Sequence, residues 1–412
     1  MTNAPVPFAA APLASGALAS VRAPSTLSLR AMSVFGVVAA MTFSATGGAP
    51  TPVFHLYQEA FGLTPFALTL IFAAYVFALL AALLTVGSLS DYIGRRPVIF
   101  AALAINVVAM LLFIDAQSAS MLIAARVAQG FATGAAVTAI GAAILDANRA
   151  RGPLLNSITT FAGLTVGSLA SSALVAYAPF PMRAVFAVLL VLSVIEAIVL
   201  VWMPETAVGK PGAFASLRPH ANVPARARAT LLRVSPVNIA GWALGGFYFS
   251  LMPSLVRVAT GLTSPMVGGG VVATLTLAAT IAVVLFRQTA ADKALALGAA
   301  IFASGVVATL AGVDLHNTPV LLMGTAIAGF GFGAAFSSTI RMVLPLAAAN
   351  ERAGLLAAFY VESYLAFALP AVIVGLVAPT FGLALSTYVY GAAIVLLAVT
   401  SLIALGLARR AA

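Results

Sequence analysis

The chain of 412 residues contains no cysteine, only three histidines, and no more than 7% charged residues. Without cysteine, a disulfide framework and a thiolate metal site are both excluded. The histidines (His55, His220 and His316) are far apart, so we expect no zinc site and no cofactor. A soluble domain carries about 25% charged residues, and this chain therefore lacks the polar surface that a water-soluble fold requires.

Apolar residues instead make up 62% of the chain, and they gather in long runs along its whole length. A run of about 18 or more apolar residues is long enough to cross a bilayer as a helix. The sequence therefore predicts an all-α membrane protein with twelve transmembrane helices. We place them at residues 31–53, 64–87, 97–115, 119–144, 154–178, 182–203, 236–258, 264–286, 293–313, 318–343, 353–377 and 383–408.

One connection is much longer than the others. Residues 204–235 are polar and basic, and we interpret them as a central linker. This linker divides the chain into an N-terminal six-helix bundle, 27–203, and a C-terminal six-helix bundle, 236–412. Residues 1–26, which are rich in Ala, Pro and Ser, are predicted to form a disordered cytoplasmic tail.

The two halves repeat each other. Gly130 and Gly329 begin similar glycine-rich stretches 199 residues apart, and the tripeptide Gly-Leu-Thr at Gly62 recurs at Gly261 with the same spacing. Agreement on one spacing indicates two parallel, pseudo-symmetric repeats. Parallel repeats of six helices are typical of alternating-access transporters.

The positive charges predict the orientation. If the N-terminus lies inside, seventeen of the 20 lysines and arginines fall in inside segments, while Arg183 and Arg257 fall outside and Arg126 lies within a helix. Inside loops of membrane proteins carry such an excess. We therefore expect both termini and the 204–235 linker to be cytoplasmic, and the net charge of +10 requires no nucleic acid.

The loop after the second predicted helix reads Gly87-Ser88-Leu89-Ser90-Asp91-Tyr92-Ile93-Gly94-Arg95-Arg96. It resembles the signature G-x-L-(A/S)-D-x-x-G-R-(R/K) of the major facilitator superfamily. The resemblance implies that Asp91 lies against the start of the eleventh helix and that Arg95 reaches Asp146. These contacts would latch the two halves on the cytoplasmic side in the outward-open state. The gating residues so implied are Gly87, Asp91, Gly94, Arg95, Arg96 and Asp146.

A second stretch, Arg126-Val127-Ala128-Gln129-Gly130, resembles the family motif R-x-x-Q-G, which is associated with proton-coupled members. An arginine inside a membrane helix is costly and usually faces a cavity or a partner. A structural hydrogen bond between helices is the alternative role. The antiporter element G-P-x-x-G-G is not kept in the fifth helix, where serines follow Gly167, so uptake stays open beside export.

Two carboxylates lie inside predicted helices, Glu196 and Glu362. A membrane carboxylate suggests a function, and proton coupling is the one we consider. In the family, helices 3, 6, 9 and 12 are peripheral, whereas helix 11 borders the cavity. We therefore predict proton coupling at Glu362, tuned by Arg126, and a structural role for Glu196. A structural acid at the cytoplasmic gate is the alternative for Glu362.

Aromatic and polar residues on the cavity helices are the candidates for substrate binding, although helix packing would also explain rings in these places. The candidates are Phe43, Gln129, Trp242, Tyr248, Phe330, Tyr360 and Tyr364.

We therefore expect a secondary active transporter that resembles the bacterial drug:proton antiporter-like branch. It would export an apolar or cationic compound with proton coupling, and uptake of a metabolite or sugar is the alternative. The sequence shows no Ser-His-Asp, metal or nucleotide-binding set, which argues against an enzyme. The expected partners are a small molecule, protons and the lipid bilayer of a bacterial inner membrane, without nucleic acid, and the expected state is a monomer.

The orientation can be tested because the chain has no cysteine of its own. An Ala215→Cys substitution in the linker should be protected from a membrane-impermeant maleimide in intact cells and should react in inverted vesicles. Thr263→Cys, between the seventh and eighth helices, should show the opposite pattern and serves as the control. Labelling of the Ala215→Cys variant in intact cells would contradict the predicted orientation.

Overall fold

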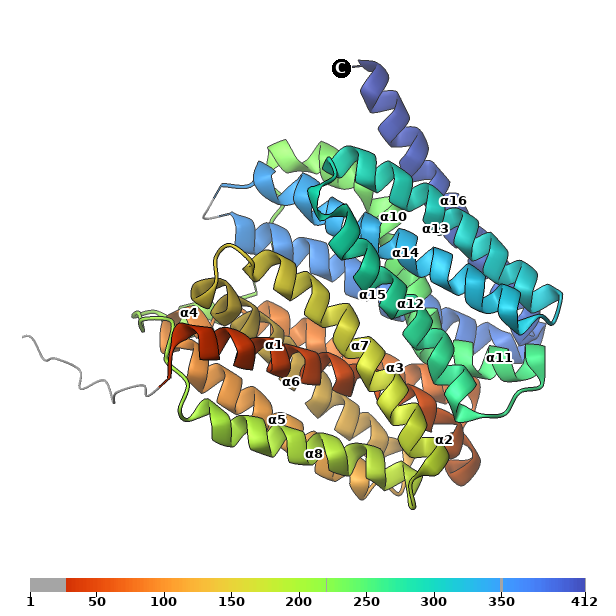
Figure 1. Cartoon of the computed structure of the whole chain (residues 1–412), viewed down its shortest axis with the longest axis horizontal. Coiled ribbons are helices and arrows are strands. Elements are labelled where there is room, and N and C mark those ends of the chain that lie inside the picture. Colours follow the sequence, from red (N-terminus) through yellow and green to blue (C-terminus); the bar gives the residue numbers. More distant parts are fainter. Residues whose placement is uncertain (1–26, 220, 349–350, 412) are drawn as a thin grey trace, which may run out of the picture.

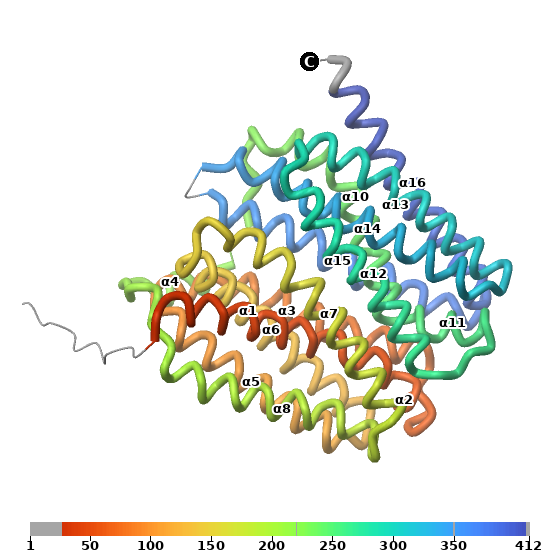
Figure 2. Tube along the Cα trace, viewed as in Figure 1, coloured from red at the N-terminus to blue at the C-terminus, as the bar shows by residue number. Residues whose placement is uncertain are grey.

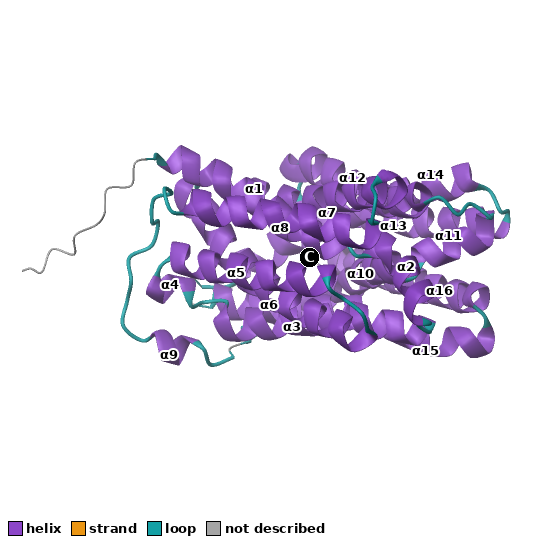
Figure 3. Ribbon diagram, turned by 90° about the horizontal axis from the view of Figure 1, so that it is seen from below, coloured by secondary structure: helices purple, strands orange, loops and turns teal. Residues whose placement is uncertain are grey.

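The computed structural model describes residues 27–219, 221–348 and 351–411. Within these residues the secondary structure is helical, without strands, as predicted. The long helices lie side by side along a common direction (Figure 3). The predicted disordered tail, residues 1–26, lies outside the described residues.

The helices divide into two groups that follow each other in the chain (Figures 1 and 2). The N-bundle comprises α1 (Leu29–Gly48), η1 (Thr51–Val53), α2 (Phe54–Phe61), α3 (Pro65–Val86), α4 (Ser90–Ile93), α5 (Arg95–Ile114), α6 (Ala119–Ala147), α7 (Gly152–Tyr177) and α8 (Pro181–Leu200). After the short helix α9 (Ala213–Ser216), the C-bundle comprises α10 (Ala225–Ser250), α11 (Met252–Thr260), α12 (Pro265–Leu285), η2 (Phe286–Gln288), α13 (Ala291–Asp314), α14 (Thr318–Val343), η3 (Leu344–Leu346), α15 (Arg352–Phe381) and α16 (Leu383–Ala411).

The number of membrane spans agrees with the prediction. Eleven helices of the described chain are long and apolar enough to cross a membrane, and one of them runs from α1 through the break at η1 into α2. α10 and α11 meet at a bend of 66°, and as one broken span they give the twelfth. Lipid offers the backbone no hydrogen-bond partner, so each crossing segment has to satisfy its own amides as a helix.

Part of the predicted linker, 204–235, is helical. α10 begins at Ala225 and continues through Pro236, so residues 225–235 are helical. Arg226, Arg228 and Arg233 made this stretch too polar for a span. Charge excludes a segment from the bilayer but not from a helix, and α10 begins before its apolar part does.

The two bundles meet most closely where α2 and α11 lie, which we call the α2/α11 end. There the Thr51 hydroxyl donates to the carbonyl oxygen of Phe249 at 2.9 Å, and farther along the hydroxyls of Thr165 and Thr276 are 2.8 Å apart. An apolar cluster joins the bundles at this end, with Val53, Phe54, Ile71, Phe72, Phe249, Val272, Ala368 and Ala371.

The opposite end carries α4 and is called the signature-loop end. Here one apolar cluster is built from the N-bundle and another from the C-bundle. In the described part of the chain, no side-chain hydrogen bond or ion pair joins the two bundles at this end. The structure therefore shows an arrangement that is closed at the α2/α11 end.

The repeated glycines occupy equivalent places in the two bundles. A Cβ atom at Gly130 of α6 would lie 2.1 Å from the carbonyl oxygen of Tyr75 in α3. In the same way, a Cβ atom at Gly329 of α14 would lie 2.2 Å from the carbonyl oxygen of Leu275 in α12. Without Cβ atoms, these helix pairs approach backbone to backbone, which is how membrane helices gain packing contacts.

The substitution Gly329→Ala tests this close approach of α14 to α12. The added methyl group forces α14 away from α12, and overpacking of this kind costs about 1–3 kcal/mol. We expect a lower thermal midpoint for the purified protein in detergent. Gly270→Ala is the control, because nothing lies within 4 Å of a Cβ atom there. Equal midpoints for the two variants would contradict the assigned packing.

Candidate functional site

The signature loop turns sharply at Gly94. Its φ of 103° belongs to the region that favours glycine, and a Cβ atom there would lie 2.7 Å from Oε2 of Glu205. Gly87 is confined by its own chain. The atom nearest to a Cβ atom at this position is the carbonyl oxygen of Leu83, one turn earlier, at 2.2 Å.

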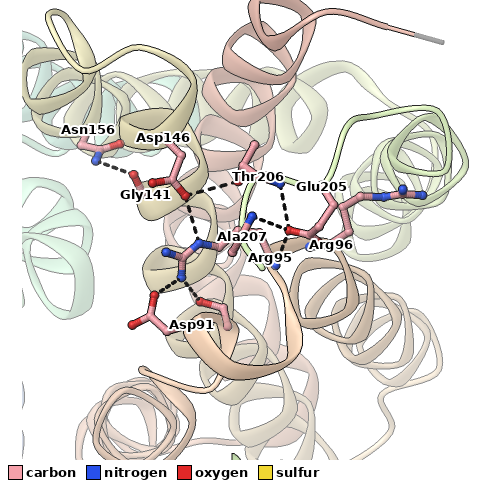
Figure 4. A network of polar contacts seen from close by, with 10 residues as sticks. Asp91, Arg95, Arg96, Gly141, Asp146, Asn156, Glu205, Thr206 and Ala207 are labelled. Atoms are coloured by element: carbon pink, nitrogen blue, oxygen red, sulfur yellow. Dashed lines mark hydrogen bonds and ion pairs between the residues drawn. The ribbon is translucent and has the colours of Figure 1, made fainter. Parts of the chain in front are cut away.

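Arg95 is the centre of a polar network at the signature-loop end (Figure 4). Its Nη1 atom lies 2.5 Å from Oδ1 of Asp91 and donates to the Ser90 hydroxyl at 2.8 Å. Its Nε atom lies 3.2 Å from Oδ2 of Asp146. The contact expected between Arg95 and Asp146 is present, and it fastens the start of α5 to the end of α6.

Asp91 lies in a setting other than the expected one. Within the described residues its ion pair is with Arg95, in the same bundle, and it makes no hydrogen bond to α15. Among the described residues no polar side chains join the bundles at this end, and the cation that pairs with Asp91 lies in its own bundle. The role of the network in gating stays a prediction.

Glu205 is the member of this network that the sequence did not reveal. Its carboxylate accepts hydrogen bonds from the backbone N–H groups of Arg95 at 2.8 Å and Arg96 at 3.0 Å. It therefore caps the start of α5, where the helix dipole favours a negative charge. The guanidinium of Arg96 donates in turn to the carbonyl oxygen of Val201 at 2.7 Å, and so holds α5 to the end of α8.

A cavity of about 110 Å³ lies between the two bundles. This is well above the ~10–15 Å³ needed for one water molecule. Residues of eight helices line it, whereas α5, α8, α13 and α16 contribute none, as the family resemblance implied for peripheral helices. Ten of the lining residues are aromatic: Phe72, Tyr75, Phe161, Trp242, Phe249, Phe332, Phe336, Tyr360, Tyr364 and Phe367.

Trp242 of α10 packs against four other rings of the cavity wall. Its centroid lies 5.2 Å from the ring of Tyr364, 5.7 Å from that of Phe367 and 5.8 Å from that of Phe336. These distances suit edge-to-face contacts. The indole Nε1 atom is buried without a hydrogen-bond partner among the described residues, so the cavity wall holds one unused donor.

Three of the seven predicted substrate residues line the cavity: Trp242, Tyr360 and Tyr364. The structure places the other four outside the lining. Phe43 is buried in the N-bundle, Gln129 donates to the carbonyl oxygen of Thr46, the Tyr248 hydroxyl bonds that of Thr325, and Phe330 packs on Phe286. On α14 the cavity face carries Phe332 and Phe336, four residues apart, and Phe330 lies off that face.

Arg126 is fully buried directly behind the cavity wall. Its guanidinium lies 5.0 Å from the centroid of the Tyr75 ring and 5.4 Å from that of Phe54. Its Nη1 atom donates to Gln129 at 2.8 Å. The Nε and Nη2 atoms have no hydrogen-bond partner among the described residues, and no described carboxylate pairs with this charge.

Comparison with known proteins identifies the family. The family model described as Major Facilitator Superfamily matches residues 32–294. This chain belongs to the Major Facilitator Superfamily. The resemblance carried by the signature loop is thereby confirmed, and the chain is a multi-pass membrane transporter.

A solved structure supports the fold of this major facilitator chain. It is similar to the crystal structure of the human organic anion transporter MFSD10 (TETRAN), with 15% sequence identity and a TM-score of 0.66. The match covers 90% of this chain and 99% of the other. Among curated proteins, none matches.

The two membrane carboxylates of this major facilitator protein have different surroundings. Both oxygens of Glu362 accept hydrogen bonds from α10, one from the Ser235 hydroxyl at 2.5 Å and one from the Asn238 amide at 2.8 Å. Glu362 does not line the cavity. Glu196 of α8 is buried and accepts one hydrogen bond, from the Thr42 hydroxyl at 2.6 Å. Proton coupling at Glu362 stays a prediction.

The capping role of Glu205 can be tested by Glu205→Ala. Removal of the carboxylate leaves the first N–H groups of α5 without acceptors and should destabilise the protein by about 1–2 kcal/mol. Thermal unfolding in detergent measures the change. Glu59→Ala is the control, because Glu59 is exposed and makes no described hydrogen bond. A Glu205→Ala midpoint as high as that of the control would show that the cap contributes nothing.

Proposed function

We propose that this transporter exports a small apolar, aromatic compound across a bacterial inner membrane, in exchange for protons and by alternating access. In this proposal both termini are cytoplasmic, and the protein acts as a monomer. The observation that carries the proposal is the aromatic cavity between the two bundles. A pocket of rings with few polar groups suits ligands that bind by apolar contact.

The charge of Arg126 favours the apolar compound among the two ligand classes expected from the sequence. Rings alone would suit a cation as well as an apolar compound. Arg126, however, lies directly behind the Tyr75 ring and has no described carboxylate partner, and none of the described lining residues is charged. An unpaired positive charge in a medium of low dielectric constant repels a second cation, which favours an uncharged ligand.

Uptake of a sugar or a polar metabolite is less well supported. A sugar needs many hydrogen-bonding groups around it, and the cavity offers few of them. Apart from three tyrosines and Trp242, its polar side chains are Ser44, Thr133, Thr160 and Thr276. Each hydroxyl of a sugar that lacked a partner would be desolvated at a cost of about 1–3 kcal/mol.

Alternating access requires that the closed α2/α11 end open while the signature-loop end closes. In the proposed cycle, Asp91 then gains the start of α15 as a second partner, and the Arg95 network carries α4 as a rigid unit. The ion pair between Arg226 and Glu351 holds the start of α10 to the residue that precedes α15, so the C-bundle offers a fixed surface there.

The ligand class can be tested with a matched pair of naphthalene compounds. The purified chain is placed in liposomes with an acidic lumen, and a pH-sensitive dye inside reports proton efflux. We expect 1-naphthylmethanol and related neutral aromatics to release lumenal protons, and the quaternary trimethyl(1-naphthylmethyl)ammonium ion to release none. Liposomes without protein give the passive leak.

Trp242→Ala should reduce the compound-dependent proton flux at least tenfold, because its ring contacts four others in the cavity. Trp202→Ala, an exposed tryptophan outside the cavity, is the control and should leave the flux unchanged. Flux driven by the cation alone would overturn the proposed ligand class. No flux with any neutral aromatic in a panel would overturn proton-coupled export.

A further inference from the structure

Glu196 is a buried acid that the transport cycle described so far does not use. It lies on α8, and 6% of its surface is exposed. Its Oε1 atom accepts the hydrogen bond from Thr42 of α1 at 2.6 Å. Its Oε2 atom is buried and has no hydrogen-bond partner among the described residues.

No cation in the described part of the chain forms an ion pair with this carboxyl group. The helices that pack against α8 are α5, α7 and α1. Their ionisable groups, and that of α8 itself, lie at helix ends and form no described ion pair or hydrogen bond with Glu196: Arg30, Arg95, Arg96, Asp115, Arg151, Tyr177 and Arg183. Arg95 is held by two aspartates, and Arg96 by the backbone of Val201.

The groups that share the interior with Glu196 are neutral. Ser193 lies one turn earlier on α8 and accepts a hydrogen bond from the Asn106 amide of α5 at 2.9 Å. The Oδ1 atom of Asn106 is buried and also has no described partner. An ionised carboxylate that is buried among neutral groups is unfavourable, whereas its protonated form carries no charge to desolvate.

Glu362 provides the contrast within the same molecule. It is half-buried, and each of its oxygens accepts a hydrogen bond from a neutral donor of α10. The geometry therefore separates one acid with a donor on each carboxyl oxygen from another with a buried oxygen that has no described donor.

We propose that Glu196 is the proton-binding carboxyl group of this transporter and that Thr42 connects its protonation to α1. A hydronium ion on one side of the membrane loses a proton to Oε2 of the carboxylate and becomes water, and a water molecule on the other side later takes this proton and becomes hydronium. Beyond Thr42, α1 carries Ser44 and Gly47 of the cavity wall. The inference rests on the proposed proton coupling and names the site that serves it.

The proposal can be tested without any substrate, so its outcome does not depend on the ligand class proposed above. Infrared difference spectra of the full chain in liposomes, taken as the pH is raised, report the carbonyl stretch of protonated carboxyl groups. We expect a band from a buried acid that disappears on deprotonation. This band should be lost in Glu196→Gln, retained at a shifted position in Glu196→Asp, and displaced in Thr42→Val, which lacks the hydroxyl donor.

Glu362→Gln tests the competing site predicted from the sequence, and it should keep the band if Glu196 binds the proton. A band that persists in Glu196→Gln, a band lost only in Glu362→Gln, or no such band in the unaltered protein would each overturn the proposal. Glutamine matches glutamate in shape, and an unchanged thermal midpoint shows that the variant is folded. If neutral aromatics move protons in the liposome assay, Glu196→Gln should abolish that flux and keep the exchange of labelled compound across the membrane.

Discussion

The contact that governs this molecule is the approach of one helix backbone to another inside lipid. Hydrophobic burial cannot hold helices together where the solvent is itself apolar, so close packing has to do so. Gly130 and Gly329 bring α6 onto α3 and α14 onto α12 at distances that no side chain would permit. These two equivalent pairs fix the inner helices of the bundles and, with them, the aromatic residues that face the cavity. A cavity with walls of this kind is rigid within each bundle, and the freedom that remains is the movement of one bundle against the other.

The polar networks lie within single bundles, where movement of one bundle against the other would not break them. The Arg95 network, with Glu205 as its cap, stays within the N-bundle and the segment that follows α8, and the pair of Arg226 and Glu351 stays within the C-bundle. Each network can therefore move as a unit without losing its hydrogen bonds. The side-chain hydrogen bonds that the described residues make between bundles involve hydroxyl groups, as at Thr165 and Thr276, and such bonds are exchanged for water at low cost.

Much of the fold could be predicted from the sequence because hydropathy and charge act locally. The spans follow from apolar runs, and the contact of Arg95 with Asp146 follows from a family motif. The start of α10 could not be placed, because charge marks the edge of the bilayer and not the end of a helix. Glu205 could not be assigned to the start of α5, since about a hundred residues separate them and only the fold joins them. For the same reason the sequence does not distinguish Phe330 from Phe332 and Phe336, which face the cavity. The face of a buried helix that is apolar all round depends on its neighbours, not on its own pattern.

The hydrogen bond from Thr51 to Phe249 joins the two places where a span is broken, at η1 and between α10 and α11. The carbonyl group of Phe249 lies in the last turn of α10, where the helix itself supplies no further donor. When the bundles separate at this end, the hydrogen bond between the Thr51 hydroxyl and the Phe249 carbonyl group breaks in a region lined by apolar side chains. Water has to enter to supply new hydrogen-bond partners for these two groups. The barrier to opening is therefore the free energy of hydrating the apolar contact between the bundles at the α2/α11 end. A substitution that makes this contact easier to hydrate would shift the resting protein toward the conformation that is open at the α2/α11 end.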